Sequence, residues 1–160
     1  MKEFNLWIKT LFFDTSALVK VYRTSEKGHE KARELLTSNK YVCYTSTVAI
    51  GEVFNVLKNR LEGKELEGAI FVFESHLKTK LIHLIERGLN SEVIDKTIGD
   101  VRSIRDRYRI EPTDALHFIM MKHSLGQLAD ESRPKIVASD KNFIKAIKEE
   151  GYEIINPEDE

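Results

Sequence analysis

Four acidic residues of this chain adjoin apolar runs instead of lying in charged stretches. Asp14 follows TLFF, Glu52 lies within TVAIGEVFNVL, Asp114 precedes ALHFIMM, and Asp140 follows KIVAS. Two carboxylates about 4 Å apart repel by about 4 kcal/mol at an effective dielectric constant near 20, so gathering four of them requires a cation. Because oxygen ligands favour hard ions, these acids predict a site for Mg²⁺ or Mn²⁺.

Each acid also has a purely structural interpretation. Asp14, Asp114 and Asp140 lie near expected helix starts, where a carboxylate caps backbone N–H groups and complements the helix dipole. Glu52 interrupts the apolar face of its helix, so it needs either a salt-bridge partner or a metal ion. We favour the metal site because it accounts for all four acids together.

The sequence around these acids predicts alternating strands and helices. Strand-like runs occupy residues 10–13, 41–45, 80–85, 135–139 and 152–155. Helical patterns occupy residues 15–22, 25–38, 46–60, 64–79, 91–108, 113–125 and 141–149. Such alternation predicts an α/β fold whose mostly parallel sheet is covered by helices on both faces.

The expected elements bring the four acids to one edge of this sheet. In open α/β sheets, ligands bind beyond the carboxyl ends of the strands. Asp14 and Asp140 each follow a strand directly. Glu52 lies about two turns into the helix that follows another strand, at 3.6 residues per turn. Asp114 is in the first turn of a helix whose start is marked by Pro112.

The composition describes a soluble globular protein. With 160 residues, 41% of them hydrophobic and 32% charged, we expect one domain over residues 1–160 with a helical hairpin inserted at about 46–79. The net charge of −1 means that any site for a polyanion must be local.

Cys43, the only cysteine, lies in a strand-like run and predicts a buried structural thiol in a reducing cytoplasm. The N-terminal run MKEFNLWIKTLFF predicts neither a signal peptide nor a membrane span.

The inserted hairpin carries more apolar side chains than one small core needs. These residues are Val53, Val56, Leu57, Ile70, Phe71, Phe73 and Leu77. We therefore expect the hairpin to form a homodimer surface.

The acidic segments resemble the PIN domain, and in particular the VapC-type toxin ribonucleases, over nearly the whole chain. FFDTSALVK resembles the opening strand-Asp-x-Ser motif, with Asp14 and Ser16 on the motif positions. STVAIGEVFN resembles the helix that carries the catalytic glutamate, here Glu52. PTDALHFIMM resembles the Asp-Ala helix, here with Asp114, and IVASDKNF resembles the closing strand-Asp motif, here with Asp140.

Two positions depart from the family pattern. Ala138 stands where the family often has Thr or Ser, and Asn142 stands where a second acid often follows. Both changes concern the position of a second metal ion and leave the first one in place.

The resemblance implies a three-layer fold with about five parallel strands, and a metal-dependent endoribonuclease of the toxin–antitoxin type. It implies that Asp14 and Asp114 are the principal Mg²⁺ or Mn²⁺ ligands, with Asp140 completing the site through water. Glu52 would hold or deprotonate the attacking water, and Ser16 would contact a ligand or phosphate. RNA would be the substrate, and an antitoxin protein would be a partner.

An arginine-rich run lies shortly before the third acid and has two interpretations. Its members are Arg102, Arg105, Arg107 and Arg109. They either contact phosphates beside the catalytic edge or form a solvated helix face on which Arg102 pairs with Asp106. His117, three residues after Asp114, either lines the site or packs in the core.

Two further classes of function stay open. A haloacid-dehalogenase-like phosphatase also has an aspartate after its first strand, but it needs an acid two residues later, where this chain has Ser16. A PIN scaffold that only binds RNA or protein is the non-enzymatic alternative. Retention of all four acids argues against it, whereas Ala138 and Asn142 keep it open. Metal titration separates the classes, because a working site gains stability from Mn²⁺ and a scaffold does not.

Overall fold

The computed structural model describes residues 9–86, 90–125 and 133–159. The run around Trp7 therefore lies outside the described residues. The strands are β1 (Lys9–Phe13), β2 (Tyr41–Ser46), β3 (Ile82–Ile85), β4 (Lys135–Val137) and β5 (Ile154–Ile155). The helices are α1 (Thr15–Tyr22), α2 (His29–Thr37), α3 (Thr47–Arg60), α4 (Gly63–Lys78), α5 (Ile94–Tyr108), α6 (Pro112–Leu125) and α7 (Lys141–Glu149).

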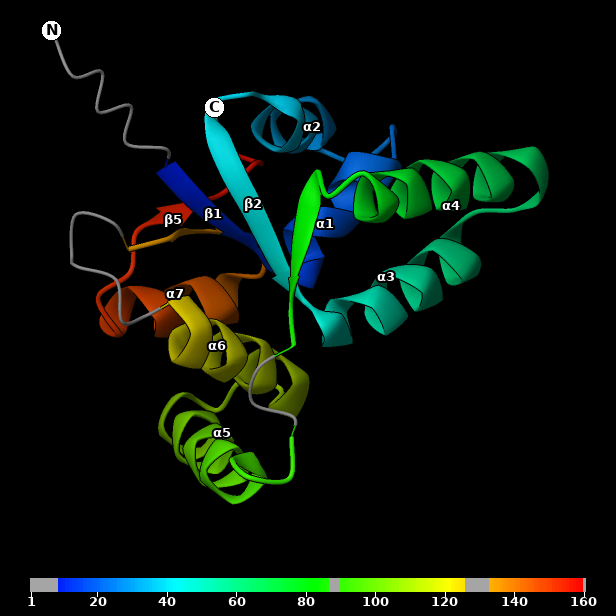
Figure 1. Ribbon diagram of the computed structural model, residues 1–160. Helices are drawn as coiled ribbons and strands as arrows, with labels where there is room; N and C mark the ends of the chain where they lie inside the picture. Colours follow the sequence, from blue (N-terminus) through cyan, green and yellow to red (C-terminus); the bar gives the residue numbers. More distant parts are fainter. Residues whose placement is uncertain (1–8, 87–89, 126–132, 160) are drawn as a thin grey trace, which may run out of the picture.

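The five strands form one parallel sheet in the order β3-β2-β1-β4-β5 (Figure 1). This confirms the expected α/β class with a central parallel sheet of about five strands. The first strand is the middle one: Leu11 is in register with Cys43 of β2 on one side and with Lys135 of β4 on the other. The strand order reverses at β1, so the carboxyl ends of β1 and β4 flank the switch point where α/β sheets bind ligands.

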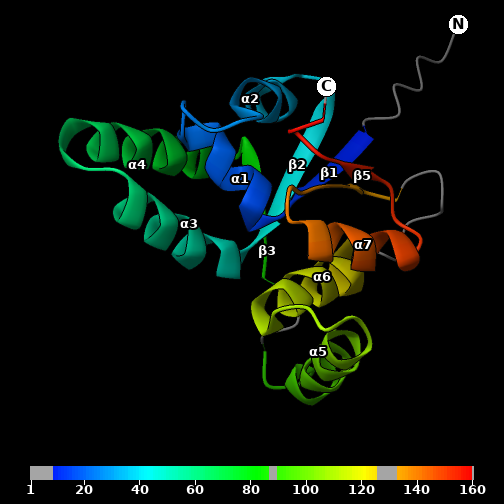
Figure 2. The ribbon, with the colours of Figure 1, turned by 180° about the vertical axis from the view of Figure 1, so that it is seen from behind.

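The sheet lies between two helical layers (Figures 1 and 2). Successive side chains of a strand point to opposite faces, and β1 uses both faces. Leu11 and Phe13 pack with the layer formed by α1 to α4, whereas Phe12 packs with the layer formed by α5 to α7. This arrangement is the three-layer fold that the resemblance implies.

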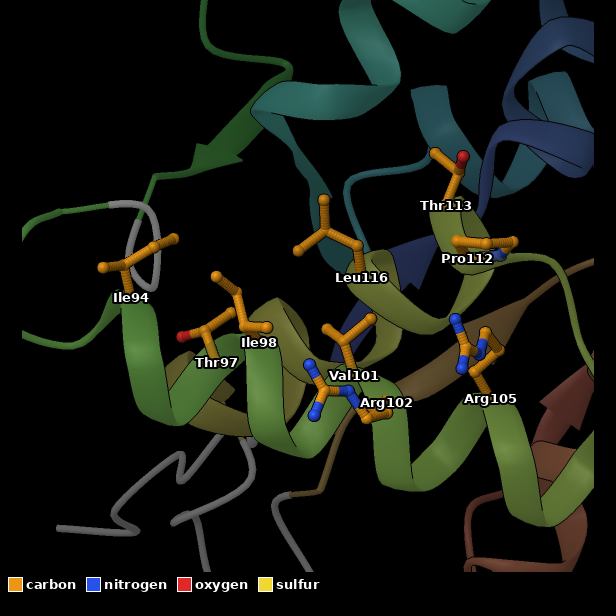
Figure 3. A pocket seen from close by; sticks show the side chains of 9 residues that line it. All are labelled: Ile94, Thr97, Ile98, Val101, Arg102, Arg105, Pro112, Thr113 and Leu116. Carbon is orange, nitrogen blue, oxygen red and sulfur yellow. The ribbon is translucent and has the colours of Figure 1, made fainter.

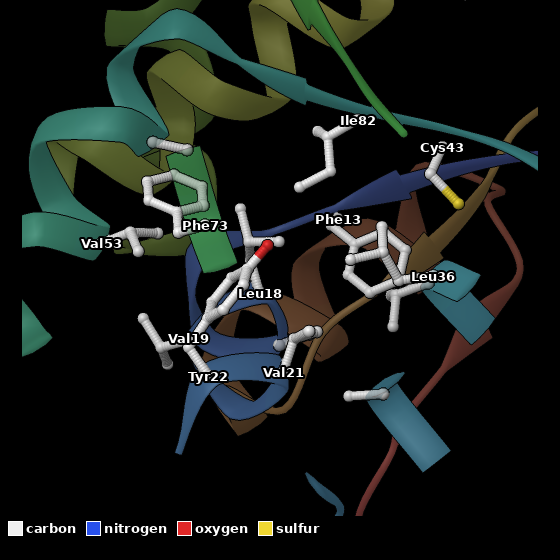
Figure 4. Close-up of a cluster of buried hydrophobic side chains, with 14 of the residues drawn as sticks. Phe13, Leu18, Val19, Val21, Tyr22, Leu36, Cys43, Val53, Phe73 and Ile82 are labelled. Carbon is white, nitrogen blue, oxygen red and sulfur yellow. The ribbon is translucent and has the colours of Figure 1, made fainter. Parts of the chain in front are cut away.

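The hairpin of α3 and α4 contributes most of its apolar residues to the core of this chain. Val53, Leu57 and Phe73 are fully buried, and Val56, Ile70 and Leu77 are partly buried against them. In Figure 4, Phe73 lies beside Tyr22, and their ring centroids are 5.0 Å apart. Only Phe71 of the seven expected surface residues is largely exposed, at 70%. The apolar surface left for a second copy is therefore smaller than the sequence indicated.

Local packing accounts for the differences from the expected boundaries. Helix α2 begins at His29 instead of near residue 25, because Gly28 adopts a left-handed conformation with φ 85°. A side chain there would place its Cβ 2.8 Å from the carbonyl carbon of Pro157.

Cys43 is buried, and burial raises the pKa of its thiol to about 12, which confirms a structural thiol. None of the helices in the described ranges has the length and apolarity needed to cross a bilayer.

Candidate active site

Hydrogen bonds around Asp14 connect the end of β1 to the end of β4. The backbone N–H of Asp14 donates to the carbonyl of Val137 at 2.9 Å. Asp14 Oδ2 accepts hydrogen bonds from the backbone N–H of Ser16 at 3.2 Å and from its hydroxyl at 2.7 Å. Ser16 Oγ in turn accepts a hydrogen bond from the backbone N–H of Ser139 at 3.0 Å. Asp14 therefore caps α1, as its structural interpretation predicts, but this function uses only one of its two oxygens.

The second oxygen of Asp14 lacks a hydrogen-bond partner among the described residues. Asp14 is 1% exposed, and no described residue hydrogen-bonds to its Oδ1. Burial raises the pKa of this carboxyl, and the charge of Glu52 adds to the shift, against opposing contributions from His117 and Ser16. A buried carboxylate oxygen in this state requires either a proton or a cation.

Asp114, at the start of α6, lies within electrostatic range of the other three acids. Its pKa is raised to about 7, first by burial and then by the negative charges of Asp14, Asp140 and Glu52. Asp140 caps α7 by accepting a hydrogen bond from the backbone N–H of Phe143 at 2.8 Å, and its side chain is exposed. The fold thus brings the four predicted acids into one electrostatic group.

Glu52 has the salt-bridge partner that its structural interpretation required, and that partner is His117. The two atoms Glu52 Oε2 and His117 Nε2 are 3.2 Å apart. Burial raises the pKa of Glu52, but hydrogen bonds from His117 and Thr15 outweigh this effect and lower it overall. Burial lowers the pKa of His117, but the hydrogen bond to Glu52 and the charges of Asp14, Glu52 and Asp114 raise it overall. Glu52 is therefore held in its ionised form.

His117 is fully buried at the centre of a polar network that the sequence did not reveal. Its Nε2 also lies 3.2 Å from Thr15 Oγ1, and its Nδ1 is hydrogen-bonded with Ser46 Oγ. Both interpretations of His117 thus hold in part, because it packs in the core and contacts a site residue. The signal for Ser46 was its position at the carboxyl end of β2, the edge to which Asp14 and Asp140 were assigned.

The donor set fits a hard divalent cation. Among the described residues, no three His, Cys, Asp or Glu side chains already form a metal-coordinating cluster. Asp14 Oδ1 has no hydrogen-bond partner among the described residues, and the raised pKa of Asp114 shows that its ionised form lacks full compensation by nearby positive charge. Carboxylate oxygens are the ligands that Mg²⁺ and Mn²⁺ prefer.

The structure separates the four arginines of the basic run. Arg107 pairs with Glu150 at 2.9 Å, and Arg109 ends α5 in a left-handed conformation. The expected pair of Arg102 with Asp106 is wrong, because Asp106 pairs with its neighbour Arg105 at 2.7 Å. The side chain of Arg102 instead lies along a groove between α5 and α6.

Solved structures share this fold. VapC20 of Mycobacterium tuberculosis, described as a sarcin-ricin loop cleaving toxin, matches with a TM-score of 0.61 and 19% identity over 85% of this chain and 94% of that chain. A toxin–antitoxin complex from Klebsiella pneumoniae has a TM-score of 0.56 and 13% identity, covering 92% of this chain and 97% of that chain. FitAcB from Neisseria gonorrhoeae has a TM-score of 0.54 and 15% identity, with the same coverage of 92% and 97%.

A sequence comparison with curated proteins gave no match. A sequence profile of the PIN domain, in contrast, matches residues 11–148, which extend from β1 into α7. This range contains all four acids and the strands whose ends position them. The chain is therefore a member of the PIN domain family.

Proposed function

We propose that this protein is a divalent-metal-dependent endoribonuclease that cleaves RNA phosphodiester bonds, and that it acts as a VapC-like toxin. The observation that carries this proposal is the group of four acids at the switch point, with a buried Asp14 oxygen that has no hydrogen-bond partner in the part of the chain that the structure describes. Membership of the PIN family supports a nuclease. The likeness to a toxin described as cleaving the sarcin-ricin loop supports RNA as the substrate.

Asp14, Asp114 and Asp140 would hold Mg²⁺ or Mn²⁺. Asp14 and Asp114 are the better-buried pair, and the exposed Asp140, whose Oδ1 caps α7, would act through water. Once bound, such an ion lowers the pKa of a water molecule and offsets negative charge on the scissile phosphate. Ser16 would keep the carboxylate of Asp14 in position, because it already joins Asp14 to Ser139.

Glu52 would orient the attacking water. Its side chain is 30% exposed, so it reaches solvent, and its Oε2 is hydrogen-bonded to His117 of the buried network. A carboxylate whose pKa is lowered stays ionised and accepts a hydrogen bond well, but it is a weaker base. We therefore assign Glu52 to holding the water more than to removing its proton.

The proposal also covers the partner, the oligomeric state and the location of this protein. An antitoxin protein is the proposed partner, supported by the toxin–antitoxin complex among the structures with this fold. A homodimer would use the exposed Phe71 and its neighbour Val72 on α4, and a monomeric mass at micromolar concentration would reject it. We propose the cytoplasm as the location and one domain over residues 1–160 as the organisation.

The test is cleavage of a panel of structured and single-stranded RNAs with Mg²⁺ or Mn²⁺ and with EDTA. The wild type should cut only with metal, and Asp14→Asn should lose this activity. Asparagine caps helices as well as aspartate does, so this variant should keep its fold. Asp95→Asn, which changes an exposed acid in the first turn of α5, is the matched control and should cut normally.

Other outcomes would favour the alternatives. Wild-type cleavage rates in Asp14→Asn would refute the assignment of the site. No cleavage and no stabilisation by Mn²⁺ would favour a scaffold that binds RNA or protein. The phosphatase alternative loses its support, because the chain belongs to the PIN family and Ser16 hydrogen-bonds to Asp14 where that chemistry needs an acid.

A further inference from the structure

A groove of about 420 Å³ lies between α5 and α6, beside the proposed active site (Figure 3). Aliphatic side chains form its floor: Ile94, Ile98, Val101 and Leu116. Arg102 and Arg105 line it from α5, and Pro112 and Thr113 line it from α6. Ile98 is 49% exposed, so this apolar surface is open to solvent. The residues found to line the groove include no carboxylate.

The groove adjoins the acidic site through a single helix. Pro112, Thr113 and Leu116 face the groove, and Asp114 and His117 of the same helix belong to the acidic site. At about 100° per residue, these two sets of side chains are centred about a third of a turn apart on α6. The groove and the acidic site therefore lie on neighbouring faces of α6.

The two arginines of the groove differ from the next arginine of the same helix. Arg107 pairs with Glu150, which anchors it outside the groove. Arg102 forms no ion pair within the described part of the chain. Among the described residues, Arg105 pairs only with the exposed Asp106. Such surface ion pairs are worth about 0–1 kcal/mol, so a phosphate can displace Asp106. In Figure 3 the side chains of Arg102 and Arg105 lie on the same side of α5 as Ile98 and Val101.

From this arrangement we infer that the groove binds the nucleotide next to the scissile bond of a single-stranded RNA. The nucleobase packs on Ile98, Val101 and Leu116, and Arg102 and Arg105 contact its phosphates. This inference rests on the proposed nuclease function and adds a substrate subsite to it. Single-stranded RNA is read through splayed bases that stack on side chains, including the planes of arginine guanidinium groups.

Charge favours RNA over a protein occupant. Four carboxylates repel a polyanion, so a substrate that must reach them needs cationic contacts close by. Arg102 and Arg105 supply these contacts at the groove, and guanidinium groups bind phosphate oxygens through paired hydrogen bonds. A protein partner has no corresponding need for cations next to the acidic site.

The test measures binding of a fluorescent single-stranded RNA of mixed sequence, about ten nucleotides long, in EDTA over a series of salt concentrations. Each phosphate contact to a single strand contributes about 0.7 to the salt slope, so the double variant Arg102→Gln/Arg105→Gln should lower the slope by about 1.4. Between about 50 and 200 mM salt, the wild type should then lose about sevenfold more affinity than the double variant. Arg107→Gln is the matched control and should keep the wild-type slope.

The apolar floor is tested separately. Ile98→Ser should weaken RNA binding several-fold at every salt concentration without changing the slope, because it removes contact with a base and not with a phosphate. Phe71→Ser, at another exposed apolar position that lies on α4 and does not line the groove, should bind as the wild type does. Normal thermal unfolding of Ile98→Ser would show that a binding defect is not a folding defect.

Each outcome has a distinct meaning. Wild-type binding by the groove variants, with metal-dependent cleavage by the wild type, would overturn this inference and leave the proposed function intact. A wild type that neither binds nor cuts RNA would overturn both. Unchanged RNA binding, with uptake of a labelled leucine–glutamate helical peptide of about 15 residues that Ile98→Ser abolishes, would overturn the RNA assignment in favour of a protein partner.

Discussion

Replacing Asp114 by asparagine should stabilise the metal-free protein while it removes the response to metal. Burial raises the pKa of Asp114 to about 7 in the folded chain, and the charges of Asp14 and Asp140 add to the effect. The folded state therefore binds this proton more tightly than the unfolded chain. The ionised carboxylate therefore costs folding free energy, and this cost grows as the pH rises from 3.8 to about 7 and then stays constant.

The magnitude follows from the pKa. Moving a pKa from 3.8 to about 7 corresponds to about 4 kcal/mol, at about 1.4 kcal/mol per tenfold change. Asp114 is only partly buried, and solvent screens its interactions, so we expect Asp114→Asn to raise the free energy of unfolding by about 2 kcal/mol at pH 8. Below pH 3.8 the gain should disappear, because the carboxyl is then protonated in both states.

Urea denaturation in EDTA at acidic and alkaline pH measures this difference. Asp106→Asn changes an exposed acid and should stay within about 0.5 kcal/mol of the wild type at both pH values. Added Mn²⁺ at about 100 times its dissociation constant should stabilise the wild type by about 2.7 kcal/mol and Asp114→Asn by far less. An asparagine variant no more stable than the wild type at pH 8, or a gain that does not depend on pH, would show that the ionised Asp114 does not destabilise the fold.

Three further predictions concern the core, a turn and the metal. Phe73→Ala should lower the free energy of unfolding by about 3–5 kcal/mol in denaturant titrations, because this ring is fully buried. Gly28→Ala should destabilise by about 1–3 kcal/mol, because φ is 85° and its Cβ would meet Pro157, whereas Gly51→Ala, in open space on α3, should stabilise slightly in the same assay. The rise in melting temperature caused by Mn²⁺ should shrink as the pH falls below about 7, because protonated Asp114 is a poor ligand; a shift independent of pH would contradict this.

The sequence predicts the parts of this structure that depend on local pattern. The sequence places Asp14 and Asp140 at the carboxyl edge because each directly follows a short apolar run. The first run forms β1, whereas β4 covers only Lys135–Val137 of the expected 135–139, so Asp140 lies three residues beyond its end. The start of α2 was predicted too early, because Gly28 turns against Pro157, which is far away in the sequence. The last strand is shorter than the expected 152–155. It covers only Ile154–Ile155, because these two residues are the ones that pair with β4.

The polar network of the site depends on contacts between distant residues. Glu52 interrupts an apolar helix face, and this pattern predicts a partner without identifying it. His117, the partner, comes from another helix and is oriented by Ser46 and Thr15. Spacing alone also paired Arg102 with Asp106, whereas the side chain of Arg102 lies along the groove. Pairings of this kind become visible only when side-chain directions are fixed by packing.

The central position of β1 affects when a newly synthesised chain can become active. β1 precedes the other four strands in the chain, yet one of its two neighbours in the sheet is β4. The pairing of Leu11 with Lys135 can therefore form only after β4 has been synthesised. Contacts between such distant residues form late in folding, and domains emerge from the ribosome at about 5–20 residues per second. Asp140 and α7 follow β4, and Glu158 then closes onto Lys20 at 2.6 Å. A growing chain therefore carries Asp14, Glu52 and Asp114 for seconds before the edge that unites them with Asp140 exists, and the proposed nuclease would stay inactive for that time.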